Sequence, residues 1–596
     1  MRASRRGPRR RRGRSGSRPR RAASAFDRAP RPRSPRARPG CRAARRRRRR
    51  RAEVRSASPR VNPYTETRGL ARGKRVRRAS LGDVTSPPRS DRDKRPIVFR
   101  KVLIANRGEI AVRVIRTLRE MGIASVAVYS DADRDALHVR LADEAVHIGP
   151  PLVRDSYLRA DKILDAARRT GAEAIHPGYG FLSENAGFSQ ACADAGIVFV
   201  GPPASAIAAM GSKTEARARM IEAGVPVVPG GSADTLEEAR ETARQIGYPV
   251  MVKAAMGGGG KGMRLCFHEE DLERAVDRAR SEAQKSFGDG KVYLEKAILK
   301  PRHVEVQVLG DKHGNVVHLF ERDCSVQRRH QKVVEETPCP AAPDDLVRKM
   351  GDVAVRAAKA VDYCSAGTIE FLLDQDGHFY FLEMNTRLQV EHPITEWVTG
   401  IDLVREMLRV AYGEPLGYGQ DDIVRRGAAI EVRVYAEDPA TGFLPSPGKV
   451  TALVAPAGPF IRDDGGVYAG AEVSSHYDPL ISKLSVWAPT RALAVERMRR
   501  ALGEYVVSGI RTNLPFHERL FRHPDFIAGR YHTGFIDEHK AALLQGMDSP
   551  SESDEAALAV ALAVAVAGRQ VRVEPVTSGE HGVSPWLAQH RTRQLR

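Results

Sequence analysis

From Ile97 onward, short apolar runs alternate with stretches whose apolar residues repeat at helical spacing, and this alternation restricts the chain to few folds. Val102–Ala105 has the composition of a buried strand. The segment after it predicts a helix with one apolar face, formed by Ile110, Val114, Ile115 and Leu118. Ser125–Ser130 predicts the next strand. Strands that alternate with helices in this way are typical of a parallel sheet covered by helices on both faces, so we expect an α/β fold class.

The turn after the first predicted strand excludes one common use of such a sheet. A dinucleotide site needs G-x-G-x-x-G at this position, whereas Asn106–Glu109 contains a single glycine. We therefore expect no nicotinamide or flavin site there.

A run of glycines, Gly257–Gly260 with Gly262, lies between two apolar segments that predict strands. Lys253 and Lys261 lie at its edges. A flexible linker is one interpretation, but linkers are rarely enclosed by two apolar strands, so we favour a mobile loop that covers phosphates. It is not a Walker A loop, because Gly262 stands where Ser or Thr is required.

The basic residues are concentrated at the N-terminus. Residues 1–97 contain 34 Arg and 2 Lys against 6 acidic residues, or +30, while the whole chain carries +24. This segment lacks hydrophobic periodicity, and we expect it to be disordered. It could bind RNA or another polyanion, or act as an organellar transit peptide. We favour a third interpretation, in which GC-rich DNA upstream of the true start is translated and the segment is not part of the mature protein.

Six scattered cysteines without a C-x-x-C pair indicate a reducing compartment and argue against a zinc site. No apolar run approaches the roughly 20 residues needed to cross a membrane. We expect a cytoplasmic protein that does not bind membranes, or an organellar one if 1–97 is a transit peptide.

The segment GTIEFLLDQDGHFYFLEMN predicts a β-hairpin, since Asp376-Gly377 is a strong turn signal. A two-residue loop there places Glu370 opposite Glu383. Two carboxylates in that arrangement destabilise a sheet unless a cation lies near them. With Asn385 they form a set of three oxygen ligands, which suits Mg²⁺ or Mn²⁺.

Polar residues continue at every second position of EMNTRLQVEHP. If the chain stays extended to the end of this segment, one face carries Glu383, Asn385, Arg387, Gln389 and Glu391. A solvent-exposed strand face would also alternate. We favour a metal and anion site, because the polar members include no Lys, Ser or Thr and the neighbouring segments are apolar.

A second charged cluster occupies residues 321–336, and it contains Arg322, Arg328, Arg329, His330 and Lys332 among acidic residues. Such a run is usually a solvated surface. Beside a nucleotide loop and a metal strand, we expect some of these charges to hold an anion.

Taken in order, HPGYGFLSEN, KAAMGGGGKGM, PRHVEVQ, ERDCSVQRRHQKVVEE, EMNTRLQVEHP, AEDP and FLPSPGKV closely resemble biotin carboxylase, the ATP-grasp component of acetyl-CoA and related acyl-CoA carboxylases. The resemblance covers about 99–540. It implies an ATP-grasp fold with a Rossmann-like N-terminal domain, a small mobile lid and a mixed-sheet C-terminal domain. The expected divisions are an extension at 1–97, the N-terminal domain at 98–211, the ATP-grasp domain at 212–430 with its lid at about 225–300, the C-terminal domain at 431–540 and a linker or tail at 541–596.

The resemblance also implies the site residues. The ATP-binding positions are Lys213, Lys253, Gly259, Gly260, Glu295, Lys296, Ala297, Ile298, His303, His330, Glu370, Leu372 and Glu383. The metal ligands are Glu370, Glu383 and Asn385. The bicarbonate and biotin pocket is formed by Lys332, Arg387, Val390 and Arg433. The catalytic residues are Lys332, Arg387, Arg433 and Glu391, the last as general base.

The implied reaction uses ATP, two Mg²⁺ or Mn²⁺ ions, bicarbonate and biotin. Glu391 deprotonates bicarbonate, the carbonate attacks ATP, and the resulting carboxyphosphate releases CO₂ beside biotin, whose enolate Arg433 stabilises. No AMKM-like biotinylation motif is present, so we expect a biotin carboxyl carrier protein and a carboxyltransferase on separate chains. The family further implies a homodimer. Nucleic acid binding is expected only through 1–97, if at all.

Two other functions compete with this one. Another ATP-grasp ligase could form an acyl or carbamoyl phosphate, but carbamoyl phosphate synthetase would be expected to repeat the glycine loop and the EMN motif, and neither is repeated here. A nucleic-acid binder acting through its Arg-rich segment would have no need of an intact set of catalytic residues.

Overall fold

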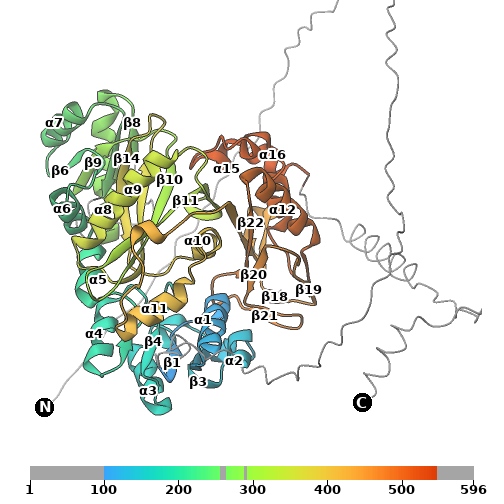
Figure 1. The fold of residues 1–596 in the computed structure, drawn as a ribbon. Coiled ribbons are helices and arrows are strands. Elements are labelled where there is room, and N and C mark those ends of the chain that lie inside the picture. The colour runs from blue at the N-terminus through green and yellow to red at the C-terminus, as the bar shows by residue number, and fades with distance from the viewer. Residues whose placement is uncertain (1–98, 255–263, 288–290, 547–596) are drawn as a thin grey trace, which may run out of the picture. The chain divides into compact units, whose positions relative to one another are not determined.

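The computed structural model describes residues 99–254, 264–287 and 291–546 (Figure 1). Three predictions lie outside these residues: the disordered extension at 1–97, the phosphate-covering loop at Gly257–Gly262, and the tail after 546.

A five-stranded parallel sheet forms the N-terminal part, in the order β3-β2-β1-β4-β5. Its strands are β1 (Lys101–Ile104), β2 (Ala124–Ser130), β3 (Glu144–Gly149), β4 (Ala174–His176) and β5 (Val198–Phe199). Its helices are α1 (Gly108–Met121), α2 (Leu137–Leu141), α3 (Ala160–Thr170), α4 (Ala186–Asp194) and α5 (Ala204–Gly211). The predicted apolar face of α1 is buried, as expected for a helix that covers a parallel sheet. The predicted α/β class is confirmed.

A small antiparallel sheet with its own apolar core follows, in the order β6-β9-β7-β8. The strands are β6 (Gly230–Ala233), β7 (Val250–Ala254), β8 (Arg264–Cys266) and β9 (Val292–Lys296), and the helices are α7 (Leu236–Ile246) and α8 (Leu272–Phe287). The preceding helix α6 (Lys213–Glu222) buries Ala216 and Met220 in the core of the large sheet instead. A capping box between Thr235 and Glu238 begins α7. This unit coincides with the segment in which the lid was predicted.

The third sheet has eight strands, all paired antiparallel, in the order β14-β13-β10-β11-β12-β15-β22-β20. Its members are β10 (Arg302–Gly310), β11 (Val316–Arg328), β12 (Gln331–Thr337), β13 (Ser365–Leu373), β14 (Phe379–Asn385), β15 (Ala428–Tyr435), β20 (Ile461–Gly465) and β22 (Leu480–Ala488). The domain boundary predicted between residues 430 and 431 falls inside β15, all of whose residues are buried. The predicted ATP-grasp and C-terminal domains therefore share one continuous sheet.

The remaining helices surround this sheet: α9 (Asp344–Lys359), α10 (His392–Thr399), α11 (Leu403–Tyr412), α12 (Arg491–Glu504), α13 (Leu514–Leu520), α14 (Pro524–Ile527), α15 (Phe535–Glu538) and α16 (Lys540–Leu544). The short strands are β16 (Glu437–Asp438), β17 (Leu444–Pro445), β18 (Gly448–Lys449), β19 (Ala452–Val454), β21 (Glu472–Val473) and β23 (Val506–Ser508). Within the described ranges, no helix has the length and apolarity to cross a bilayer.

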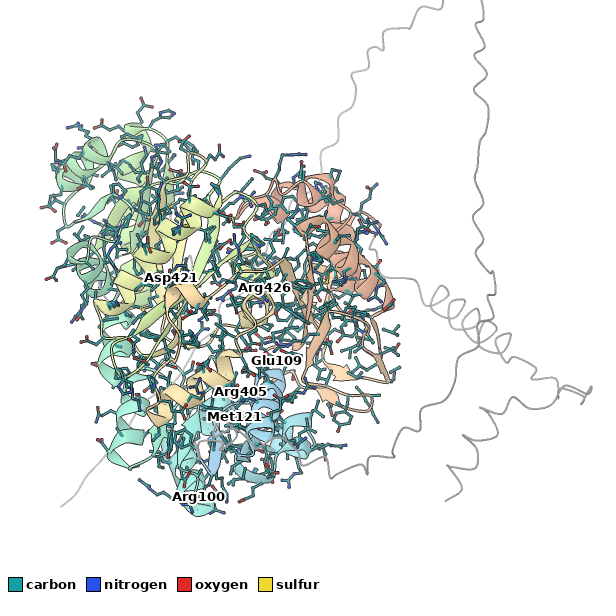
Figure 2. The ribbon with its side chains drawn as sticks, viewed as in Figure 1. Arg100, Glu109, Met121, Arg405, Asp421 and Arg426 are labelled. Atoms are coloured by element: carbon teal, nitrogen blue, oxygen red, sulfur yellow. The ribbon has the colours of Figure 1, made fainter. Side chains whose placement is uncertain are left out.

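One buried ion pair connects the first and third sheets. Glu109, labelled in Figure 2, lies in the first turn of α1, and its carboxylate is 3.2 Å from the ammonium nitrogen of Lys483 in β22. Lys483 is completely buried and also donates a 3.0 Å hydrogen bond to the carbonyl oxygen of Val390. This lysine therefore joins the N-terminal helix to the segment before α10.

The predicted hairpin is present, with a different loop. Glu370 and Glu383 are opposite each other, as predicted. The prediction of a two-residue loop was wrong: the loop has three residues and ends at Gly377, whose φ is 86°. The Asp374 carboxylate stabilises it by accepting hydrogen bonds from two backbone N–H groups of the turn. A bulge at Leu382 shifts the register back, so the two glutamates still meet.

The prediction of one extended strand as far as Glu391 was wrong. Strand β14 ends at Asn385, and α10 begins directly after Glu391 with Pro393 in its first turn, a position that favours a helix start. Between them the chain bends toward Glu184, whose carboxylate accepts a 2.8 Å hydrogen bond from Nε of Arg387. Only the first two members of the polar alternation lie on the strand.

Candidate active site

Each of the three sheets contributes to the lining of one cavity of about 1600 Å³, either through its strands or through the segments that follow them. The predicted site residues that line it are Lys253, Glu295, Lys296, Ala297, Ile298, His303, His330, Lys332, Glu370, Leu372, Glu383, Asn385, Arg387, Val390 and Arg433. Glu391 is fully buried beneath the lining. Lys213 begins α6, but its side chain is not among the described ones, and Gly259 and Gly260 lie outside the described residues.

Three carboxylates form a row across three neighbouring strands of the large sheet. Glu305 of β10 is paired with Glu370 of β13, which is paired in turn with Glu383 of β14. The ammonium nitrogen of Lys332 lies 2.5 Å from an oxygen of Glu305 and 2.9 Å from an oxygen of Glu370. Nε2 of His303 lies 2.8 Å from the other oxygen of Glu370. These cations offset the repulsion that such a row would otherwise cause.

The charges in this row stabilise one another. Burial opposes ionisation of Glu370, but Lys332 and His303 outweigh it and hold the pKa of this carboxyl well below its usual range. Burial likewise opposes protonation of His303, but Glu370 outweighs it and raises the histidine pKa. The site therefore holds an ionised glutamate between the Lys332 ammonium group and the His303 ring.

Glu391 lies where two cationic side chains meet. One of its oxygens is 2.7 Å from Nζ of Lys332, and the other is 3.0 Å from Nη2 of Arg433. Burial opposes its charge, but Lys332, Arg433 and Arg322 together hold the Glu391 pKa well below its ordinary value. Glu335 accepts a 2.7 Å hydrogen bond from Nε of Arg433 and fixes that guanidinium.

The charged cluster at 321–336 divides into two groups. Arg322 is completely buried, and its donors are taken by Glu305 at 2.6 Å and by Gln307, Thr368 and Thr395. Arg328 pairs with Glu437 at 2.7 Å. These two arginines support the protein itself and do not line the cavity. Arg329, His330 and Lys332 do line it.

Arg329 and His330 form the two-residue loop between β11 and β12, and both have a positive φ, 51° and 66°. Such values suit a tight hairpin but are uncommon for residues with large side chains. Strain of this kind is concentrated at functional sites, where the surrounding structure maintains it. The loop places two side chains at the edge of the cavity.

The small antiparallel sheet contributes an ion pair and a backbone segment. Lys253 of β7 pairs with Glu295 of β9. The ammonium group of Lys296 donates to the carbonyl oxygens of Gly247 and Tyr248, at 3.0 and 2.8 Å. The side chain of Lys296 is therefore committed to this unit.

Sequence reasoning missed several supporting residues: Glu184, Glu305 and Glu335. It named Arg322 only as a member of the charged cluster at 321–336. A signal existed for one of the missed residues. In PRHVEVQ the polar residues His303, Glu305 and Gln307 occupy every second position, the same alternation that identified the neighbouring strand.

Comparison with known families covers most of the described chain. Family models match at 98–207 (biotin carboxylase, N-terminal domain), 212–418 (carbamoyl-phosphate synthase L chain, ATP binding domain) and 431–538 (biotin carboxylase C-terminal domain). A biotin carboxylase from Nostoc is 53% identical over 442 residues, which cover 74% of this chain and 99% of that protein. The chain belongs to the biotin carboxylase family. The predicted family, ATP-grasp fold class and ligase class are confirmed.

Longer relatives and solved structures agree with this assignment to the biotin carboxylases. The propionyl-CoA carboxylase alpha chain of Ruegeria pomeroyi is 52% identical, over 78% of this chain and 72% of its own length. The biotin carboxylase domain dimer of the Hydrogenobacter thermophilus 2-oxoglutarate carboxylase, solved with MgADP, ADP and bicarbonate, has a TM-score of 0.70 and is 48% identical. The match covers 76% of this chain and 100% of that one. The family model described for carbamoyl-phosphate synthase matches only residues 212–418 of this chain, and the models on either side of it are described for biotin carboxylase. The alternative ligase is therefore not favoured.

Proposed function

We propose that this biotin carboxylase uses ATP and bicarbonate to carboxylate biotin on a carrier protein, the first half-reaction of an acyl-CoA or related carboxylase. The observation that carries the proposal is the position of Glu391. It lies between Lys332 and Arg433, buried beneath a cavity whose wall carries Glu370 and Glu383. A buried carboxylate between two cations can accept a proton from an anion that both cations hold.

The nucleotide would occupy the part of the cavity between the lid and the large sheet. Ala297, Ile298 and Leu372 offer apolar surface for the base. The phosphates would meet Lys253 with Lys213, Gly259 and Gly260, while Glu295, His303 and His330 complete the predicted contacts. Lys253 pairs with Glu295, and both residues line the cavity.

The metal ligands would be Glu370, Glu383 and Asn385. Two carboxylates opposite each other and an amide oxygen, without sulfur, form a donor set that fits Mg²⁺ or Mn²⁺. When bound, the ions would neutralise charge on the phosphates of ATP.

Bicarbonate would bind between Lys332 and Arg387, beside Val390. Its negative charge next to Glu391 raises the proton affinity of that carboxylate, which the two cations otherwise hold low. Glu391 then takes the bicarbonate proton, a carbonate oxygen attacks the γ-phosphorus, and the bond to ADP breaks. The product, carboxyphosphate, separates into CO₂ and phosphate.

Biotin would enter from the side of Arg433. The phosphate released from carboxyphosphate removes the proton from the ureido nitrogen, and this nitrogen attacks CO₂. Arg433 places a fixed positive charge where the ureido oxygen becomes negative, and Glu335 holds the guanidinium in position.

We further propose that the carrier and the carboxyltransferase are separate chains and that the enzyme acts as a homodimer. Support comes from the Nostoc biotin carboxylase, which the match covers over 99% of its length, and from the dimer of the Hydrogenobacter thermophilus domain. The cytoplasmic location stays a prediction.

A direct assay tests the activity. ADP release would be measured with bicarbonate and free biotin added separately and together, while carboxybiotin is followed with labelled bicarbonate. We expect ADP release that needs bicarbonate, and label in biotin only when both are present. Bicarbonate-dependent ADP release with no labelled biotin, and with label captured by ammonia, would favour the carbamoyl phosphate alternative.

A further inference from the structure

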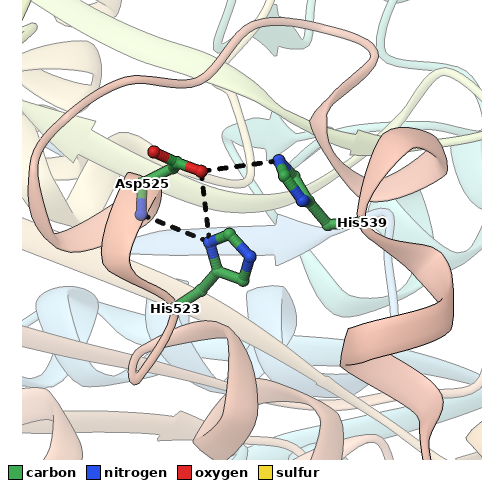
Figure 3. A group of neighbouring side chains, drawn as sticks. All are labelled: His523, Asp525 and His539. Carbon is green, nitrogen blue, oxygen red and sulfur yellow. Dashed lines mark hydrogen bonds and ion pairs between the residues drawn. The ribbon is translucent and has the colours of Figure 1, made fainter. Parts of the chain in front are cut away.

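Three potential metal ligands converge near the C-terminal end of the described chain, away from the row of carboxylates (Figure 3). His523 precedes α14, Asp525 lies within it, and His539 joins α15 to α16. Oδ2 of Asp525 is 3.9 Å from Nδ1 of His523 and 3.8 Å from Nε2 of His539. Ligands held at about 2.0–2.1 Å by a tetrahedral zinc ion are separated by roughly 3.4 Å, so a small contraction would complete the geometry.

The three side chains are held in place by their neighbours. Both imidazole rings pack on buried Phe535, with centroid distances of 5.3 Å for His523 and 4.8 Å for His539. Arg530 donates to Oδ1 of Asp525 at 2.8 and 3.1 Å, which turns Oδ2 toward the histidines. Partners of this kind orient the ligands in known metal sites.

The protonation of His523 suits a metal ligand. The backbone N–H of Asp525 donates to its Nδ1 at 3.3 Å. An N–H group can only donate, so this nitrogen carries no proton, and zinc would replace this long hydrogen bond at its single lone pair. A neutral imidazole is the form that binds metals.

We propose that His523, Asp525 and His539 bind a Zn²⁺ ion, with water completing its coordination. Two imidazole nitrogens and one carboxylate oxygen suit zinc and its first-row neighbours, whereas Mg²⁺ prefers a set made only of oxygen. The cysteine pattern argued against zinc, but this site uses no cysteine.

The site has an entry path and a connection to the active site. Asp525 and His539 line a second cavity of about 770 Å³, through which an ion can enter. Between the zinc ligands, Thr533, Gly534 and Asp537 line the large active-site cavity. Zinc would therefore brace one wall of the catalytic site.

The test uses the full chain, stripped with a chelator and then titrated with Zn²⁺ in excess Mg²⁺. We expect one zinc per chain, a higher melting temperature, and visible absorption bands when Co²⁺ replaces Zn²⁺. His523→Gln and His539→Gln should each weaken zinc binding at least tenfold and remove the cobalt bands. In chelator, both variants should melt like the stripped wild type, which shows that they fold.

His378→Gln is the matched control. His378 belongs to another cluster, whose carboxylates Asp374 and Asp376 line the same cavity, so a change there tests whether zinc binds at the hairpin instead. This variant should bind zinc normally. The proposal is overturned if the wild type binds no zinc, or if binding survives both His523→Gln and His539→Gln.

Discussion

The ammonium nitrogen of Lys332 lies 2.7 Å from Oε1 of Glu391, and it also contacts Glu305 and Glu370 at 2.5 and 2.9 Å. One buried cation thus serves three buried carboxylates that come from three separate segments. Of the three, Glu391 alone is also bound by Arg433. The proposed base is therefore connected to both the carboxylate row and the proposed biotin side.

Replacing the proposed base should separate chemistry from nucleotide binding. In Glu391→Gln, Lys332 keeps two acidic partners and the shape of the side chain is retained, so we expect the fold and the affinity for ATP to persist. Bicarbonate-dependent turnover should fall by about 10²–10⁴, the usual contribution of a general base. Steady-state ADP release and calorimetric nucleotide titration measure the two quantities. Turnover within a factor of three of the wild type would refute this role.

Neutralising one proposed metal ligand should change the requirement for magnesium. Glu383→Gln removes a charge from the pair opposite Glu370, so the Mg²⁺ concentration for half-maximal ATP turnover should rise at least tenfold. Asp376→Asn, on the turn of the same hairpin, is the control and should leave this concentration unchanged. Normal turnover of Glu383→Gln at low Mg²⁺ would place the metal elsewhere.

Arg433 should matter for biotin and for stability, but little for ATP. In Arg433→Ala, Glu335 and Glu391 lose a buried partner, so the free energy of unfolding should fall by about 3–5 kcal/mol. Carboxylation of biotin should fall at least 100-fold, while the ATP dissociation constant changes less than threefold. Arg433→Lys keeps the charge and should recover much of the stability. A large loss of ATP affinity with normal biotin carboxylation would contradict the assignment.

Glu109 should make stability depend on pH. Burial raises its pKa to about 7, with Lys483 opposing the shift. Between the unfolded pKa of about 4.3 and this value, the folded state binds more protons than the unfolded state, so this residue's contribution to stability falls as pH rises. Relative to the wild type, Glu109→Gln should therefore gain up to roughly 3 kcal/mol between pH 5 and 8. Urea unfolding at several pH values measures the difference, and a constant difference would contradict the prediction.

The sequence predicted the elements whose pattern is local. The apolar spacing in α1, the parallel sheet around β1 and the pairing of Glu370 with Glu383 all depend on residues close together in the chain or on a short turn. The first two follow from side-chain periodicity, whereas Glu370 meets Glu383 because the bulge at Leu382 compensates for the longer loop.

What could not be predicted depends on distant partners. Strand β14 ends early because the chain bends toward Glu184, which is 203 residues from Arg387. Arg322 is buried because Glu305 and Thr395 take its donors, and Thr395 is 73 residues away. The prediction of the loop after Asp374 was wrong for a local reason. The Asp374 carboxylate accepts a hydrogen bond from the backbone of its own turn, and this favours a longer loop than the two-residue one.

Strand β15 limits where this chain could exchange parts with another gene. A recombination breakpoint near 212 falls between α5 and α6 and interrupts no strand. A breakpoint at 430 would build β15 from two genes, although this buried strand has to pair with β12 on one side and β22 on the other. The two regions on either side of 430 would therefore have to be inherited together.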